Sequence, residues 1–302
     1  MRDRSSILAM AMLFVGVQLM AVLLSSILPS DYQAFEDAED PANPVYYVVM
    51  LLIMTALILL LIRFGKGNIL KGVFYFAFFT TLIYVFFPLY AQVIDADTAG
   101  ILAVVSSVTM VSLMALRPEW YVLNTIGFLV AIGVTAIIGI SLGILPVIIL
   151  LVLLAIYDFI SVYRTKHMLT LAEGVTKLNL PILFVVPKEK GFKMDAMAEG
   201  SMKEENKERG ALFMGLGDAI IPGALVVSAF NFLDGAEGVV NNADLIVALG
   251  TIVGGLLGFL ALMRFVLTGR PQAGLPLLNG GAIIGYIVTY LVAYQDLGLG
   301  MF

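Results

Sequence analysis

The chain has 302 residues, 61% of them hydrophobic, and its mean hydropathy is +1.01. Soluble domains carry only about 45 to 50% apolar residues, so this composition indicates a polytopic membrane protein. The absence of cysteine excludes disulfides, thiolate metal sites and a cysteine nucleophile. A metal site at the single histidine, His167, would need all its other ligands from carboxylates. The formal net charge of −5 is less informative than the distribution of the charges among the loops.

Nine apolar segments are predicted to cross a bilayer core of about 30 Å, which takes about 20 helical residues. Residues 120–157 carry no charge and would form a helix of about 57 Å, so they must fold back on themselves. Gly139 to Gly143 supplies the turn, and Pro146 suits the first turn of the following helix. The sequence therefore predicts an all-α membrane protein with nine transmembrane helices, at residues 7–28, 45–62, 72–93, 99–116, two within 120–157, 211–233, 245–263 and 275–294.

The basic residues predict the orientation, because positively charged loops stay on the cytoplasmic side. With a cytoplasmic N-terminus, all 17 Lys and Arg residues fall on cytoplasmic segments, and the opposite loops carry only acidic residues. We expect an extracytoplasmic C-terminus and a location in the cell membrane. Three regions follow: residues 1–164 with six spans, residues 165–210 as a cytoplasmic loop, and residues 211–302 with spans seven to nine.

The loop contains an apolar run bracketed by Pro181 and Pro187 that is too short to span the membrane. Its β-branched and aromatic residues predict an extended segment. Residues 166–178 suit a short interfacial helix, whereas the charged residues 188–209 suggest poor order. The extended segment has two interpretations: an ordinary hydrophobic linker, or a strand edge that captures an unwound substrate by β-augmentation.

Two aspartates lie within consecutive spans, Asp158 near the end of the sixth and Asp218 near the start of the seventh. At helical rise they lie roughly 9 Å and 13 Å from the cytoplasmic charges, so their depths match. Intramembrane carboxyls mark functional sites, and two close carboxyls share one proton, as aspartic proteolysis requires. Gly215 and Gly217 remove bulk beside Asp218, which allows a helix or a substrate backbone to approach.

Tyr157-Asp158 and Gly215-Leu216-Gly217-Asp218 resemble the YD and GxGD motifs of the presenilin and signal peptide peptidase family of intramembrane aspartyl proteases. The family motif Pro-Ala-Leu at the ninth span is approximate here, either with Gly274 and Leu275 at the Ala and Leu positions or with Pro276 heading Pro-Leu-Leu. The resemblance implies no metal and no organic cofactor. It implies catalytic roles for Asp158 and Asp218, and supporting roles for Tyr157, Gly215, Leu216, Gly217, Gly274, Leu275 and Pro276.

The predicted function is an intramembrane aspartic endopeptidase that hydrolyses peptide bonds within transmembrane helices of its substrates. A proton-coupled transporter or channel using the same carboxyls is the alternative, disfavoured by the lack of inverted internal repetition, and a catalytically silent helix-binding scaffold is a third. Expected partners are transmembrane-helix substrates and lipid, without nucleic acid. The short loop favours an uncut chain that works without accessory subunits, and a homo-oligomer stays open.

Several features have simpler structural interpretations. Gly250, Gly254 and Gly258 repeat every four residues and are predicted to let the eighth span pack closely on a neighbour, as are Gly281 and Gly285 in the ninth. Pro276 either initiates a helix or contacts substrate, and Tyr157 either serves the site or is an ordinary interfacial tyrosine.

Overall fold

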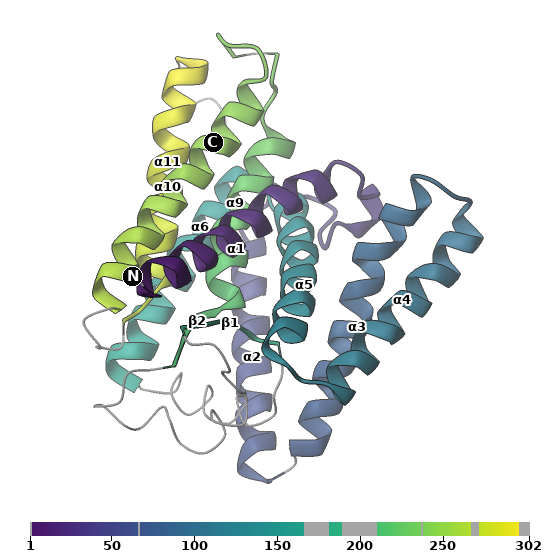
Figure 1. Ribbon diagram of the computed structural model, residues 1–302. Helices are drawn as coiled ribbons and strands as arrows, with labels where there is room; N and C mark the ends of the chain where they lie inside the picture. The colour runs from purple at the N-terminus through teal and green to yellow at the C-terminus, as the bar shows by residue number, and fades with distance from the viewer. Residues whose placement is uncertain are drawn as a thin grey trace.

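The computed structural model describes residues 2–65, 67–165, 181–188, 210–236, 238–266 and 272–295 (Figure 1). These ranges contain nine α-helices and two strands. The elements are α1 Arg2–Ser25, α2 Asn43–Arg63, α3 Gly67–Ala91, α4 Ala96–Leu116, α5 Trp120–Ser141, α6 Ile144–Ile160, β1 Leu183–Pro187, β2 Ala211–Gly215, α9 Leu216–Phe232, α10 Ala243–Val266 and α11 Leu275–Tyr294. Residues 166–180 and 189–209, where an interfacial helix and poor order were predicted, lie outside the described residues.

Eight of these helices are long and apolar enough to cross a membrane, and α9 is a shorter apolar helix of 17 residues. The reversal predicted within residues 120–157 is confirmed, since α5 ends at Ser141 and α6 begins at Ile144. Gly143 occupies the N-cap position of α6, and Pro146 lies in its first turn. The chain is therefore a multi-pass integral membrane protein.

Polar residues fix several helix ends outside the bilayer core. The Asp95 side chain accepts a hydrogen bond from the Thr98 N–H at the start of α4. This bond holds the pKa of Asp95 below its usual value, as expected for an N-cap carboxylate. At the other end of a helix, Gln295 adopts a left-handed conformation and closes α11.

The prediction of a helix over residues 211–233 is wrong at its beginning. Residues 211–215 form strand β2, which pairs antiparallel with β1 so that Leu183 lies opposite Gly215 and Pro187 opposite Ala211. The helix itself starts only at Leu216. A depth calculated from helical rise therefore does not apply to the segment before Asp218. The extended segment predicted between the two prolines is confirmed as β1.

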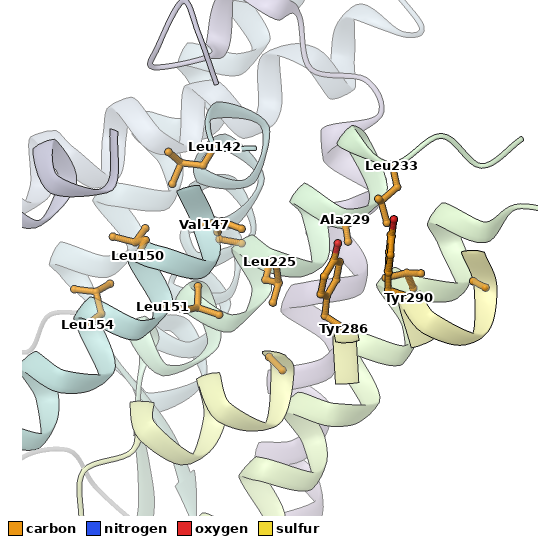
Figure 2. Packing of buried hydrophobic residues seen from close by; sticks show 14 of the residues in the cluster. Leu142, Val147, Leu150, Leu151, Leu154, Leu225, Ala229, Leu233, Tyr286 and Tyr290 are labelled. Carbon is orange, nitrogen blue, oxygen red and sulfur yellow. The ribbon is translucent and has the colours of Figure 1, made fainter. Parts of the chain in front are cut away.

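Helix α9 lies at the centre of the bundle and contacts α1, α5, α6, α10 and α11. Its buried face includes Leu225 and Ala229, which pack with leucines of α6 and with Tyr286 and Tyr290 of α11. Figure 2 shows these side chains meeting between the three helices. By contrast, α3 and α4 form a peripheral hairpin beside α5 (Figure 1). The central helix is thus the one that carries Asp218.

Helices α10 and α11 pack backbone against backbone, as their glycines predicted. A side chain on Gly254 would collide with the Gly281 carbonyl and with the backbone of Gly285. A side chain on Gly258 would likewise collide with the Leu277 carbonyl. Because these contacts admit only hydrogen, they fix where α11 lies on α10.

Candidate active site

Asp158 lies in the last turn of α6, where its side chain is only 4% exposed. The backbone continues into a π-helical turn, Ser161–Thr165, and the Ser161 N–H reaches the carbonyl oxygens of Asp158 and Tyr157. Single π-helical turns are frequent at functional sites. A carboxyl this deeply buried needs hydrogen-bond partners, which come from another helix.

Those partners are the first backbone amides of α11. The Leu275 N–H donates to Oδ2 of Asp158 at 3.1 Å, and the Gly274 N–H also hydrogen-bonds this carboxyl. The first N–H groups of a helix have no partner within the helix and carry a partial positive charge, so they suit a carboxylate. The start of α11 is therefore docked on the end of α6.

Asp218 is the third residue of α9, directly after the strand β2. Its carboxyl turns back to hydrogen-bond the backbone of Gly215, the N-cap residue of α9. This is the geometry of a helix N-terminus closed by its own third residue. A Cβ on Gly215 would lie 3.4 Å from Oδ2 of Asp218, so the glycine leaves this carboxyl room.

Gly274 brings the two aspartates to one place. Its N–H bonds Asp158, while a Cβ on it would lie 3.4 Å from Oδ1 of Asp218. Both carboxyls therefore border the same residue at the start of α11. Three helices, α6, α9 and α11, therefore converge with two carboxyls and two backbone donors.

The remaining predicted residues have different environments. Leu216 is buried, whereas Gly217 is exposed and a Cβ on it would have no described atom within 4 Å. Pro276 lies in the first turn of α11, which agrees with its helix-initiating interpretation. The hydroxyl of half-buried Tyr157 has no recorded hydrogen bond within the described part of the chain.

Two buried asparagines near the site were not predicted. Asn124 of α5 donates from Nδ2 to the Val185 carbonyl and accepts from the Val185 N–H, both at 2.8 Å. Asn279 of α11 donates to the Leu151 carbonyl of α6 at 2.8 Å, one turn beyond Leu275. The available signal was an amide within an otherwise apolar span, since such residues commonly bond across helices in membranes.

The arrangement suits acid–base chemistry on a bound substrate rather than metal chemistry at this place. Within the described ranges, no group of three or more His, Asp or Glu side chains could hold a metal ion. A carboxyl pair that shares one proton offers a base and an acid together. Such a pair can activate water and protonate a carbonyl in the same step.

The chain was compared with protein families and with solved structures. The family model described as signal-peptide peptidase, presenilin aspartyl protease matches residues 11–294. A solved presenilin family intramembrane aspartate protease in space group C222 is 37% identical, with a TM-score of 0.70 over 95% of this chain and 99% of that chain. A structure of the same description in space group P2 has 37% identity and a TM-score of 0.67 over 95% and 98%. Comparison with curated proteins gave no match.

Proposed function

Since this chain belongs to the signal-peptide peptidase and presenilin family of aspartyl proteases and is an intramembrane aspartic endopeptidase, we propose that Asp158 and Asp218 are its catalytic residues. The observation that carries this proposal is their convergence at Gly274 from two different helices. The reaction needs no further carboxyl, because one base and one acid suffice for peptide hydrolysis.

The proposed reaction uses one ionised and one protonated carboxyl. The ionised carboxylate takes a proton from water while the water oxygen attacks the peptide carbonyl carbon, and the protonated carboxyl donates to the carbonyl oxygen. The tetrahedral diol then collapses: the carboxyl that took the water proton donates it to the leaving nitrogen, the other carboxylate accepts a proton from a diol hydroxyl, and the C–N bond breaks. The products are a carboxyl end and an amine end within the former transmembrane helix.

We assign the ionised role at the start of the reaction to Asp158. It accepts hydrogen bonds from the Gly274 and Leu275 N–H groups at the positive end of α11. Backbone donors favour the charged form of a carboxyl, and Asp158 has two of them whereas Asp218 has one, from Gly215, so we assign the shared proton to Asp218. Asp218 then donates it to the substrate carbonyl oxygen.

We place the N-terminus in the cytoplasm, the C-terminus outside and the enzyme in the cell membrane. The basic residues support this orientation, because the end of α2, the start of α3, the end of α4 and the end of α10 share one side of the bundle in a serial up-and-down path. Asp158, at the end of α6, then lies toward the cytoplasmic face. Single-span substrates with an extracytoplasmic N-terminus suit this orientation.

We further propose that an unwound substrate pairs with strand β2. The Leu216 N–H bonds the Ile182 carbonyl and the Lys188 N–H bonds the Gly210 carbonyl, so residues 182, 184, 186 and 188 form the hydrogen-bonded pairs with β2. The backbone N–H and carbonyl of Val185 therefore point away from β2, and the Asn124 amide binds both of them at that edge of β1. On β2, the backbone N–H and carbonyl of Phe213 likewise point away from β1, and among the described residues they have no hydrogen-bond partner. The capturing edge is thus assigned to β2 rather than to the segment at residues 180–186.

The edge assignment is tested by Phe213→Pro, which removes the outward N–H without removing a bond to β1. We expect cleavage of a single-span substrate to fall at least tenfold, whereas the control Phe213→Leu, which keeps the N–H, retains it. Equal cleavage by both variants would eliminate β2 as the capturing edge. Circular dichroism and thermal unfolding of both variants verify that the fold survives.

The catalytic assignment is tested with the purified chain and its Asp158→Asn and Asp218→Asn variants, each given a single-span substrate in liposomes. Product masses locate the cleaved bond. Cleavage within the substrate span that disappears in both variants supports the dyad, and cleavage that persists in either variant refutes it.

The same assay tests for accessory subunits, because we infer that this chain needs none and acts uncut. Activity that appears only after a second protein is added would contradict this. Light scattering of the active preparation reports whether it is a homo-oligomer.

A further inference from the structure

Asn124 occupies the position that a third strand would take beside β1. Its carboxamide both donates to and accepts from Val185, and the side chain is 9% exposed. A primary amide presents the same donor and acceptor as a peptide group, so it satisfies an outward-facing residue of an edge strand. The sheet is thereby attached to α5 by two hydrogen bonds of 2.8 Å.

The same face of α5 also contacts the start of α9. Gly127 follows Asn124 by one helical turn, and a Cβ on Gly127 would lie 3.4 Å from the Pro181 carbonyl oxygen and 3.5 Å from Cδ1 of Leu216. Leu216 is the first residue of α9, and its N–H donates to the Ile182 carbonyl at 3.1 Å. A continuous set of contacts therefore runs from α5 through β1 to the N-terminus of α9, two residues before Asp218.

The other contacts of the sheet are apolar and less directional. Phe184, Met214 and Leu216 pack into one buried cluster with residues of α1, α5 and α10. Apolar packing sets the volume between the elements, but it tolerates small sliding movements better than a paired hydrogen bond does. The orientation of the strand pair about α5 is thus specified by the amide.

We propose that Asn124 is a positioning residue for peptide hydrolysis, acting through β1 and Leu216 on the placement of Asp218; this rests on the proposed catalytic role of Asp218. Loss of the amide leaves the Val185 N–H and carbonyl without their partner in a buried place, and the strands shift to recover bonds. A displacement of about 1 Å at a reacting group lowers the rate on the order of 100-fold. Substrate affinity changes less, because the strand pair moves as a unit and the outward edge of β2 keeps the backbone groups proposed to pair with substrate.

The test compares Asn124→Ala with Ser228→Ala in the liposome cleavage assay. Ser228 is also fully buried and donates from Oγ to the Leu142 carbonyl at 2.9 Å, but it lies near the opposite end of α9 from Asp218. Both variants remove a buried side-chain bond to backbone, so both are expected to unfold at a lower temperature. Only Asn124→Ala is expected to lower kcat, by roughly ten- to a hundredfold, with KM within about twofold of the unchanged chain.

Two further variants keep the test informative if Asn124→Ala does not fold. Asn124→Asp retains an acceptor for the Val185 N–H and loses the donor, so its kcat should lie between those of the parent and the alanine variant. Val185→Pro removes the Val185 N–H itself, which donates to Asn124, and should lower kcat as well. Hydrogen exchange at Leu216 should accelerate in the Asn124 variants and not in Ser228→Ala.

Unchanged kcat in Asn124→Asp and Val185→Pro, or an equal fall of kcat in Ser228→Ala, would overturn the proposal. Asp158→Asn and Asp218→Asn belong in the same experiment. If those variants still cleave, the catalytic assignment fails, whatever the result at Asn124. If they are inactive and the Asn124 variants are fully active, only the positioning role fails.

Discussion

The carboxyl of Asp158 combines two separable roles, the proposed acid–base chemistry and the docking of α11. The Leu275 and Gly274 N–H groups depend on its oxygens. We therefore expect both Asp158→Asn and Asp158→Ala to abolish cleavage, but only the alanine variant to leave these buried donors unpaired. An unpaired buried donor costs about 1 to 3 kcal/mol.

Hydrogen exchange of the Leu275 amide measures this difference. Exchange should be much faster in Asp158→Ala than in Asp158→Asn, whose side-chain oxygen still accepts a hydrogen bond. Equal exchange in the two variants would show that the start of α11 is held by other contacts, such as the bond from Asn279 to the Leu151 carbonyl.

Gly274 occupies the position where the family motif has alanine, if Leu275 is placed at its leucine. An added Cβ would lie 3.4 Å from Oδ1 of Asp218 and 3.4 Å from Cδ2 of Leu262, the short end of ordinary van der Waals contact. We expect Gly274→Ala to keep kcat/KM within about threefold. Gly274→Val adds two further methyl groups beside the carboxyls and should lose at least tenfold by crowding. Steady-state kinetics of the two variants provide the measurement, and a fully active Gly274→Val would contradict it.

At the scale of elements, most helices and the extended segment β1 could be predicted, but strand β2 and its pairing with β1 could not. Long uncharged runs and the Gly139 to Gly143 turn defined the spans, because a bilayer requires about 20 apolar residues. Residues 211–215 read equally well as helix or strand, since a short apolar run has no diagnostic period. Their strand partner is separated by residues 188–210, and pairing between distant segments leaves no local signal. Asn124 was overlooked for the same reason, as its partner Val185 lies far along the chain.

The packing of α11 on α10 sets where the backbone donors of α11 meet Asp158. Adjacent glycines of α11 offer a matched comparison, because a Cβ on Gly281 would collide with the Gly254 carbonyl and a Cβ on Gly280 would have no described atom within 4 Å. Gly281→Ala should destabilise the protein by about 1 to 3 kcal/mol through overpacking and should lower cleavage with it. Gly280→Ala should leave both unchanged. Thermal unfolding in detergent together with the cleavage assay decides this, and equal behaviour of the two variants would count against close packing of the two helices.

At the scale of the whole molecule, the site is assembled from three distant parts of the chain. Asp158 comes from α6, Asp218 from α9 and the backbone donors from α11, and the central position of α9 brings the three together. Residues of α5 and β1 contact the start of α9, where we propose that they hold it in place. The proximity of the two carboxyls is therefore a property of the complete bundle, although each motif is local.

The proposed orientation has the dyad near the cytoplasmic face and can be tested without background labelling, because the chain has no cysteine. Single cysteines are introduced at four exposed positions: Ser30 and Val93 on the side assigned as extracytoplasmic, and Phe64 and Glu119 on the opposite side. In intact cells, a membrane-impermeant thiol reagent should label Ser30→Cys and Val93→Cys only, and the other two should react after permeabilisation. None of these changes removes a basic residue, so the charge pattern that sets the orientation is kept. The reverse labelling would place the N-terminus outside, and substrates with a cytoplasmic N-terminus would then suit the enzyme. Labelling of one site from each pair would mean that the number of spans before Glu119 is wrong.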